Sequence, residues 1–472
     1  MSREGKLVKN TAILAIGTFF PKLAAFIILP ILTACLTKDE YGTYDLILTL
    51  VSLILPAVTL QIQSAAFRFL IDVRHDEDEI KKIITNIYGF VIITSLIALC
   101  AMYYFLGNQR FEIRLAICSY FFFDLMSNSS RQVIRGLSKN IEYSISAFVS
   151  SFGQVVLTIV LVLGLKMGLL GGIIALCFSE LLSTVFLFFK GRIYRYIDFR
   201  ELNMEKIKEL LDYSWPMVPN SLSQWVIYAS NRLVITFFMG TAANAVFAVA
   251  YKIPAILSFA QTTFNMAWQE HASIISKDED VATYFSSMYK KMFEIVAGCM
   301  AVLIGITPII FKILVRGDYE EAYNQIPILY MGIFFFCLSS FWGGIFVAYR
   351  KTKIVGTTTV AAAICNLLIA ISTIQWIGLY AASISLLTSY LLLCIIRMIG
   401  VQKIIRLNYN WRHITIVIGL LVVQCVICFQ KNIILNILNF LFGFIIAVAI
   451  NKDVIKIMIN RGIALINRKM NG

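Results

Sequence analysis

Residues 10–36 read NTAILAIGTFFPKLAAFIILPILTACL, and Lys22 is the only charged residue among them. A membrane-spanning helix needs about 20 consecutive, mostly apolar residues, so this stretch is long enough to cross a bilayer. A cleaved signal peptide also follows a basic segment, but its apolar core is shorter and ends in small residues at the cleavage site. We therefore expect residues 10–36 to remain in the membrane as the first span.

The composition of the whole chain extends this prediction. Of the 472 residues, 59% are apolar and 14% are charged, whereas soluble domains average about 45–50% and about 25%. This apolar content is enough to fill about fourteen membrane spans. These values exclude a soluble enzyme, a disordered scaffold and a secreted disulfide-bonded domain.

Further apolar runs follow one another along the chain, separated by charged or Gly- and Asn-rich breaks. They predict an all-α, polytopic membrane protein with about 14 transmembrane helices. The predicted spans are residues 10–35, 42–66, 84–106, 115–136, 143–165, 168–189, 216–239, 243–268, 289–314, 325–348, 354–376, 378–399, 411–429 and 432–451.

Basic residues are distributed unevenly over the segments between these spans. If both termini are cytoplasmic, and basic residues toward the end of a span are counted with the adjacent segment, the inner side holds 31 of the 41 Lys and Arg residues and the outer side holds 7. The remaining 3, Lys22, Arg232 and Lys252, lie within spans. Cytoplasmic loops are enriched in Lys and Arg, so this bias predicts that both termini are cytoplasmic. Topology then explains most of the net charge of +14, and we predict no nucleic-acid partner.

The longest inner connection divides the chain after the sixth span. Its segment 199–211 has apolar residues at helical spacing, which predicts an amphipathic helix at the membrane surface. Spans 1 and 7 resemble each other weakly and both run outward, which indicates two six-helix lobes in a parallel repeat. The predicted domains are an N-terminal lobe (1–189), a cytoplasmic amphipathic linker (190–213), a C-terminal lobe (214–403), and two peripheral helices with a basic cytoplasmic tail (404–472).

Ionisable residues at membrane depth are the candidate functional residues, because they are costly there and usually face a water-filled cavity or a partner. In the fourth span Asp124, Asn128, Arg131 and Arg135 are spaced by 4, 3 and 4 residues and therefore share one helical face. Other candidates are Asp45, Gln63 and Arg68 in or just after the second span, Gln224 and Arg232 in the seventh, Lys22 in the first and Lys252 in the eighth.

Several of these residues also have a structural interpretation. Arg68, Arg131 and Arg135 lie close enough to the inner surface to be topology anchors whose long side chains reach the interface. Asp45 is placed to cap the start of its helix. Glu180 and Glu294 are interpreted as structural partners of basic residues.

Lys22, Arg232 and Lys252 lie too deep to reach the interface easily, which favours exposure to a cavity. Such a cavity would combine cations with hydroxyl and amide groups. That combination suits an anionic, hydrogen-bonding substrate such as a diphosphate that carries sugars.

Proline residues gather in the equivalent helices of the two predicted lobes. Because proline interrupts the helical hydrogen-bond ladder, these helices are expected to kink or break. A bending gate and ordinary packing kinks both explain this clustering of Pro21, Pro30, Pro56, Pro216 and Pro254.

Neither the cysteines nor the histidines predict a metal or a cofactor. Cys425 and Cys428 form a C-x-x-C within an apolar run, without a second pair or a nearby histidine, so we interpret them as packing residues. The chain has three histidines and no phosphate-binding G-x-x-x-x-G-K-[ST] loop. We predict no cofactor and no metal site.

Four parts of the chain carry motifs of a known family: Leu29–Thr37 with Glu40–Tyr44, Tyr213–Pro219, Asn231–Arg232 and Phe264–Trp268. In these motifs the chain resembles the bacterial polysaccharide (O-antigen and capsule-type) flippases of the multidrug, oligosaccharidyl-lipid and polysaccharide exporter superfamily. Span count, orientation and the two lobes extend the resemblance over nearly the whole chain. One departure is Asn231, where relatives commonly have Asp before the Arg.

The resemblance implies a flippase that moves an undecaprenyl-diphosphate-linked oligosaccharide from the inner to the outer leaflet of a bacterial plasma membrane by alternating access. The substrate-binding residues would then be basic and amide side chains, and ion coupling would fall to acidic ones. The first group is Lys22, Arg68, Arg131, Arg232, Lys252, Asn128, Gln63 and Gln224, and the second is Asp45, Asp124 and Glu270. We expect a monomer whose partners are the lipid-linked oligosaccharide, membrane lipids and polysaccharide polymerase machinery.

Two alternatives remain open. An ion-coupled multidrug exporter of the same superfamily would favour acidic or aromatic cavity residues for cationic drugs, which the surplus of deep basic residues opposes. A membrane-bound glycan polymerase or transferase would need a sizeable loop or a carboxylate cluster for acid–base or metal chemistry, and the predicted outer loops are short. We therefore predict that the protein is not an enzyme.

Overall fold

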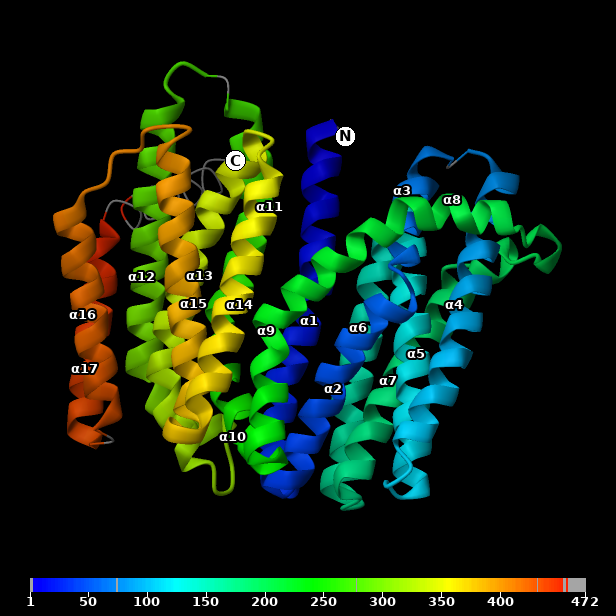
Figure 1. Ribbon diagram of the computed structural model, residues 1–472, viewed down its shortest axis with the longest axis horizontal. Coiled ribbons are helices and arrows are strands. Elements are labelled where there is room, and N and C mark those ends of the chain that lie inside the picture. The colour runs from blue at the N-terminus through cyan, green and yellow to red at the C-terminus, as the bar shows by residue number, and fades with distance from the viewer. Residues whose placement is uncertain (1–2, 74, 277, 431, 453–455, 457–472) are drawn as a thin grey trace, which may run out of the picture. The chain divides into compact units, whose positions relative to one another are not determined.

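The computed structural model describes residues 3–73, 75–276, 278–430, 432–452 and 456, and all regular elements within them are helices (Figure 1). The all-α prediction is confirmed. Helices suit a bilayer because they satisfy their backbone hydrogen bonds internally, where no water is present to do so. The predicted tail beyond residue 456 lies outside the described residues.

The first half of the chain forms eight helices. They are α1 (Arg3–Cys35), α2 (Lys38–Val58), α3 (Ile62–Asp72), α4 (Glu77–Phe105), α5 (Phe111–Gly136), α6 (Asn140–Thr158, continued by a π-helical turn over Ile159–Gly164), α7 (Gly168–Lys190) and α8 (Met204–Ser214).

Nine further helices follow in the described part of the second half. They are α9 (Val218–Met239), α10 (Thr241–Lys252), α11 (Ala255–Ile275), α12 (Val281–Leu314), α13 (Glu320–Ala348), α14 (Thr352–Ile377), α15 (Tyr380–Gln402), α16 (Trp411–Phe429) and α17 (Ile433–Ile450). By length and composition, nine helices of the described part of the chain are candidates to cross a membrane. The number of fourteen spans stays a prediction.

Two predicted spans are each divided into two helices. The span predicted at 42–66 breaks between α2 and α3, where Leu60 and Gln61 adopt left-handed φ values of 46° and 58°. The span predicted at 243–268 breaks between α10 and α11 at Pro254, which has no N–H to continue the ladder. The break at Pro254 agrees with the expectation that proline kinks or breaks these helices, whereas the break at Leu60 and Gln61 lies beyond Pro56 and was not expected.

The structure shows that Asp45 does not cap the start of α2, which was one of its two predicted roles. Thr37 and Glu40 form a capping box, in which the Glu40 N–H donates to Thr37 Oγ1 at 3.2 Å and the Thr37 N–H donates to Glu40 Oε2 at 2.9 Å. Because the helix begins at Lys38, Asp45 lies two turns inside it and cannot be its cap.

The chain forms two compact units. The first unit comprises residues 1–245 with 314–317, and the second comprises 246–313 with 318–472. In the first unit, α1 packs on α6, α5 and α6 both pack on α7, and α2 contacts α9. In the second unit, α15 packs against α13 and α14, and most of α13 is buried. The lobe boundaries remain a prediction.

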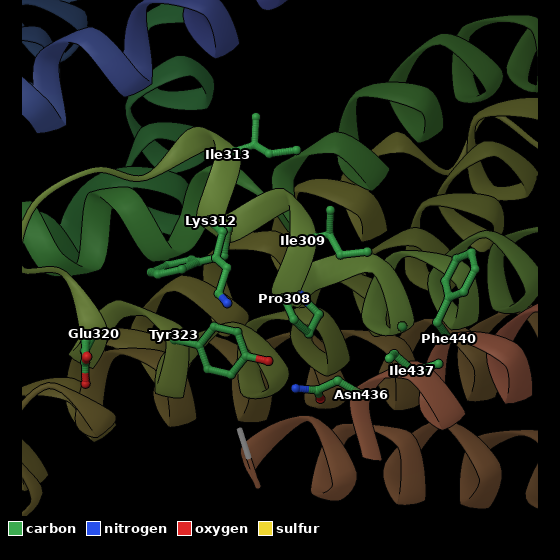
Figure 2. Close-up of a pocket in the computed structure, with 11 residues that line it drawn as sticks. Pro308, Ile309, Lys312, Ile313, Glu320, Tyr323, Asn436, Ile437 and Phe440 are labelled. Atoms are coloured by element: carbon green, nitrogen blue, oxygen red, sulfur yellow. The ribbon is translucent and has the colours of Figure 1, made fainter. Parts of the chain in front are cut away.

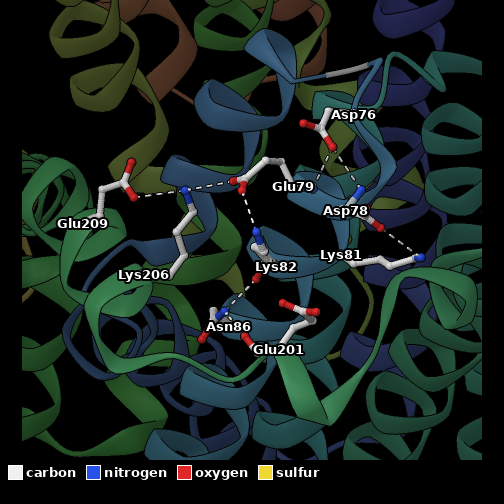
Figure 3. A network of polar contacts seen from close by, with 9 residues as sticks. All are labelled: Asp76, Asp78, Glu79, Lys81, Lys82, Asn86, Glu201, Lys206 and Glu209. Atoms are coloured by element: carbon white, nitrogen blue, oxygen red, sulfur yellow. Dashed lines mark hydrogen bonds and ion pairs between the residues drawn. The ribbon is translucent and has the colours of Figure 1, made fainter.

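The predicted linker is fixed to the start of α4. The Asn86 side chain donates to the Glu201 carbonyl at 2.8 Å and accepts from the Asn203 N–H at 2.7 Å. Glu79 pairs with Lys82 at 3.0 Å and with Lys206 at 3.4 Å (Figure 3). We call this contact the linker clasp.

The amphipathic helix itself is shorter than predicted. Two short 3-10 turns precede α8, which begins only at Met204 because the Asn203 side chain caps it by accepting from the Glu205 N–H at 2.8 Å. α8 packs on α3 and α4, and its Leu210 is fully buried.

Candidate functional site

Asp45 of α2 and Arg232 of α9 form a buried ion pair in the first unit. Arg232 Nη1 donates to Asp45 Oδ1 at 2.9 Å and to Thr49 Oγ1 at 3.2 Å. The side chains of Arg232 and Asp45 are 17% and 3% exposed. Sequence analysis assigned these residues to substrate binding and to ion coupling, but the structure makes them partners.

Helix α10 completes this group, which we call the Asp45 cluster (Asp45, Thr49, Arg232 and Asn244). Asn244 Nδ2 donates to the Gly42 carbonyl at 3.0 Å and lies 3.5 Å from Asp45 Oδ2. The cluster therefore ties α2 to both α9 and α10. The sequence offered no signal for Asn244, because a lone amide on an apolar helix is common and its partner lies 199 residues away.

The backbones of α2 and α10 touch beside this cluster. A Cβ added to Gly42 would lie 1.8 Å from the Thr241 carbonyl oxygen, so only glycine fits there. Thr241 Oγ1 donates to Asp39 Oδ1 at 2.7 Å at the same junction. The two helices are thus joined by close packing as well as by the buried charges.

A tryptophan of α9 donates hydrogen bonds to α2 beside the Asp45 cluster. Trp225 Nε1 donates to the Thr49 carbonyl at 3.1 Å and to Ser52 Oγ at 3.0 Å. Gln63, a predicted substrate-binding residue, lies on α3 beyond the break and is buried. Within the described part of the chain, Gln63 Oε1 has no hydrogen-bond partner.

A second group of charges lies among α5, α6 and α7, and we call it the Glu180 cluster (Asp124, Arg131, Ser150, Glu180 and Ser183). Arg131 Nη2 donates to Glu180 Oε2 at 2.8 Å and to Ser183 Oγ at 3.3 Å. Ser150 Oγ donates to Glu180 Oε1 at 2.8 Å. Asp124 lies about two turns before Arg131 on the same face of α5, with the half-buried Asn128 between them.

Two arginines predicted as anchors or ligands have local partners. Arg68 pairs with Asp72 at 2.6 Å on the same helix, and both side chains are more than half exposed. The Arg135 guanidinium lies 4.7 Å from the centre of the Phe67 ring. Both contacts fit an anchoring role at the end of a helix.

The remaining predicted site residues belong to neither charge cluster. Lys22 is half-buried on α1 in the first unit, and Lys252 is half-buried at the end of α10 in the second unit. The side chains of Gln224 and Glu270 lie outside the described residues.

The structural interpretation of Glu180 and Glu294 agrees with their contacts. Glu180 is the partner of Arg131, and Glu294 lies 3.5 Å from His413 Nε2 and 3.9 Å from Lys290 Nζ. Cys425 and Cys428 are both buried, and the Cys428 thiol is 3.2 Å from the Tyr323 hydroxyl. No group of three or more His, Cys, Asp or Glu side chains suited to a metal ion occurs in the described ranges.

Comparisons with known proteins agree with this architecture. The profile of a family described as polysaccharide biosynthesis protein matches residues 7–269. A search of curated proteins finds no significant match.

Solved structures share the fold at low sequence identity. The lipid II flippase MurJ in an inward closed conformation is 13% identical with a TM-score of 0.70, over 95% of this chain and 100% of that one. A multidrug resistance MATE family transporter of the MOP superfamily, in an inward-facing conformation, is 13% identical with a TM-score of 0.68, over 86% and 99%. A MOP superfamily transporter from Pyrococcus furiosus is 14% identical with a TM-score of 0.59, over 84% and 94%.

Proposed function

Because this chain belongs to the polysaccharide biosynthesis protein family, whose profile covers more than half of it, we propose that it is a flippase for a lipid-linked oligosaccharide. The substrate would be an oligosaccharide on undecaprenyl diphosphate, moved from the inner to the outer leaflet of a bacterial plasma membrane. The fold shared with the lipid II flippase MurJ supports a transporter that works by alternating access. The family match is the observation that carries this proposal.

The Asp45 cluster supports a specific link between substrate and conformation. Arg232 is already paired with Asp45 through Nη1 at 2.9 Å, so a diphosphate that binds this guanidinium competes with the carboxylate for its positive charge. Phosphate oxygens are strong, bidentate partners for arginine. Substrate binding would thus release α2 from α9 and α10, because a ligand shifts a conformational equilibrium by its differential affinity for the two states.

The Glu180 cluster supports an assignment for ion coupling. Asp45 is engaged as a partner of Arg232 at 2.9 Å, and Glu180 is engaged as a partner of Arg131 at 2.8 Å. Asp124 lies about two turns before Arg131 on the same face of α5. Where two carboxylates lie near one cation, uptake of a proton by one of them becomes favourable. We therefore assign proton exchange to the Asp124–Glu180 pair.

Deletion of the gene in its host tests the main proposal. We expect completed lipid-linked oligosaccharide to accumulate facing the cytoplasm while surface polysaccharide falls, and the wild-type gene to reverse both changes. An Asp45→Asn/Arg232→Gln variant should be present in the membrane but fail to reverse them. Unchanged glycan levels and sidedness would reject the flippase.

The other outcomes favour the alternatives. The match to MATE transporters keeps an ion-coupled multidrug exporter as the second candidate, and a raised drug sensitivity without a glycan defect would support it. Incomplete or unpolymerised glycan would instead indicate a membrane-bound polymerase or transferase. We expect the protein to act as a monomer that hands its product to polysaccharide polymerase machinery.

For the coupling assignment, the expected result is a change in the pH dependence of transport. Glu180→Gln and Asp124→Asn should each flatten the dependence of flipping on an imposed proton gradient in proteoliposomes. Ser119→Ala, elsewhere on α5, serves as the control and should leave it unchanged. A gradient response retained in both carboxylate variants would refute the assignment.

A further inference from the structure

Helices α12, α13 and α17 of the second unit enclose a pocket of about 500 Å³ that none of the predicted site residues lines. Pockets of this size are within the range that binds small molecules. The pocket is separate from the two charge clusters described above, and its assignment does not depend on what the protein transports.

The pocket exists because α12 and α17 make backbone contact only along part of their lengths. A Cβ on Gly305 would lie 2.6 Å from Phe440 Cα, and one on Gly443 would lie 2.4 Å from the Ala301 carbonyl oxygen. Pro308 follows one turn after Gly305 and interrupts the hydrogen-bond ladder of α12. The pocket begins where this close contact ends.

The pocket lies near the end of α12 and the start of α17. Lys312 is two residues before the end of α12, and Asn436 is three residues after the start of α17. Phe440 lies about 10 Å farther along α17 than its first residue, at 1.5 Å per residue. The site thus extends about 10 Å inward from the ends of these helices, which reaches from the headgroups to the acyl chains if α12 and α17 span the membrane as the sequence predicts.

The floor of the pocket is apolar. Ile309 and Ile437 are 55% and 57% exposed, and with Phe440 they form a surface that requires an apolar cover. In a membrane such a cover is an acyl chain. Figure 2 shows Ile437 and Phe440 at one end of the pocket and Glu320 at the other.

The rim of the pocket carries one cation, one anion and one acceptor. Lys312 and Glu320 are exposed side chains that line it. Asn436 Oδ1 is buried and, among the described residues, has no hydrogen-bond partner. A buried acceptor of this kind is stabilised by a donor from a ligand. Tyr323 is engaged with the Cys428 thiol at 3.2 Å.

We propose that this pocket binds phosphatidylethanolamine. The phosphate would lie at Lys312, the ammonium would donate to Glu320 and to Asn436 Oδ1, and one acyl chain would cover Ile309, Ile437 and Phe440. The rim matches a zwitterion because it carries both charges. Phosphatidylglycerol offers no cation to Glu320, and the choline group of phosphatidylcholine has no N–H to donate.

Lipid competition on the purified, full-length protein tests the assignment. Delipidated protein in detergent micelles is mixed with equal amounts of dioleoyl phosphatidylethanolamine, phosphatidylglycerol and phosphatidylcholine, and native mass spectrometry counts the bound lipids. We expect phosphatidylethanolamine to be retained about tenfold over the other two, since charge-assisted hydrogen bonds decide the difference. Lys312→Gln and Glu320→Gln should each remove most of this preference.

Two further variants separate the pocket from general lipid contact. Lys291→Gln removes an exposed cation from the other end of α12 and should leave the preference unchanged. Ile437→Trp fills the pocket without changing its charges and should lower retention of all three lipids. Equal retention of the three headgroups, or a preference that survives Lys312→Gln, would overturn the proposal, and a preference for phosphatidylglycerol would replace it with an anion site.

Discussion

The ion pairs of Asp45 and of Arg68, both in the first unit, differ in how far their side chains are exposed. The Asp45 side chain is 3% exposed and pairs with Arg232 on another helix, whereas Arg68 and Asp72 are 51% and 60% exposed on the same helix. A buried charge that loses its partner destabilises a protein strongly, while an exposed pair contributes little. Stability should therefore depend on Arg232 and hardly on Arg68.

We expect Arg232→Gln to lower the free energy of unfolding by about 3 kcal/mol, because it leaves the Asp45 carboxylate buried without its cation. The thermal unfolding midpoint in detergent measures this. The double variant Asp45→Asn/Arg232→Gln should recover most of the loss, since both charges are then removed.

The matched control is Arg68→Gln, which should change the free energy of unfolding by no more than about 0.5 kcal/mol. If the double variant is as unstable as Arg232→Gln, the ion pair is not the cause of the instability.

At the scale of elements, α2 and α10 can pack closely because residue 42 is a glycine, which has no side chain. A Cβ on Gly42 would lie 1.8 Å from the backbone of Thr241, so no small adjustment can accommodate it. Gly356 of α14 provides the opposite case, with no atom within 4 Å of an added Cβ.

Gly42→Ala should therefore separate the two helices, lowering stability by about 3 kcal/mol as a severe overpacking substitution. Gly356→Ala should be neutral or stabilise the protein by up to about 1 kcal/mol, because alanine is the better helix former. Thermal unfolding of both variants measures the contrast. Similar behaviour of the two would show that α2 and α10 are not in contact.

The linker clasp is the second element-scale feature. Asn86 is fully buried and bonds to the backbone at Glu201 and Asn203. Asn86→Leu would leave an N–H and a carbonyl of the linker without partners, which costs about 1–3 kcal/mol for each buried group. The linker should then open locally more often.

Limited trypsin digestion of inside-out membrane vesicles measures this opening. We expect cleavage after Arg200 or Lys206 to become about tenfold faster or more in Asn86→Leu. Asn108→Leu makes the same change at an exposed position in the loop after α4 and should leave the rate unchanged. Equal rates in Asn86→Leu and wild type would mean that the clasp does not hold the linker.

At the scale of the whole molecule, the bias of 31 inner against 7 outer basic residues predicts the orientation in the membrane. It predicts that the loop between α4 and α5 faces outward and that the loop between α13 and α14 faces the cytoplasm. Both loops are short, because they comprise only residues 106–110 and 349–351.

In a background without the ten native cysteines, an impermeant maleimide should label Asn108→Cys in intact cells. Lys351→Cys should be labelled only after the membrane is opened. The reverse pattern would invert the orientation, and with it the direction of transport that we propose.

The sequence alone determined that this is an all-α membrane protein and where most of its helices lie. Hydropathy over about 20 residues and the bias of basic residues are properties of local composition, so they can be read without the fold. The capping box of Thr37 and Glu40 could also be recognised from its sequence spacing. Because it fixes the start of α2 at Lys38, Asp45 does not cap this helix. The break at Leu60 and Gln61 was not, because these residues do not normally favour left-handed φ.

Only the tertiary structure decided which charges become partners. Arg232 and Asp45 are 187 residues apart, and Arg131 and Glu180 are 49 apart. The sequence places such residues on a helix face but does not say which face of another helix will meet it. That choice depends on close packing at Gly42 and along the other contacts between helices, which is settled only when the whole unit assembles.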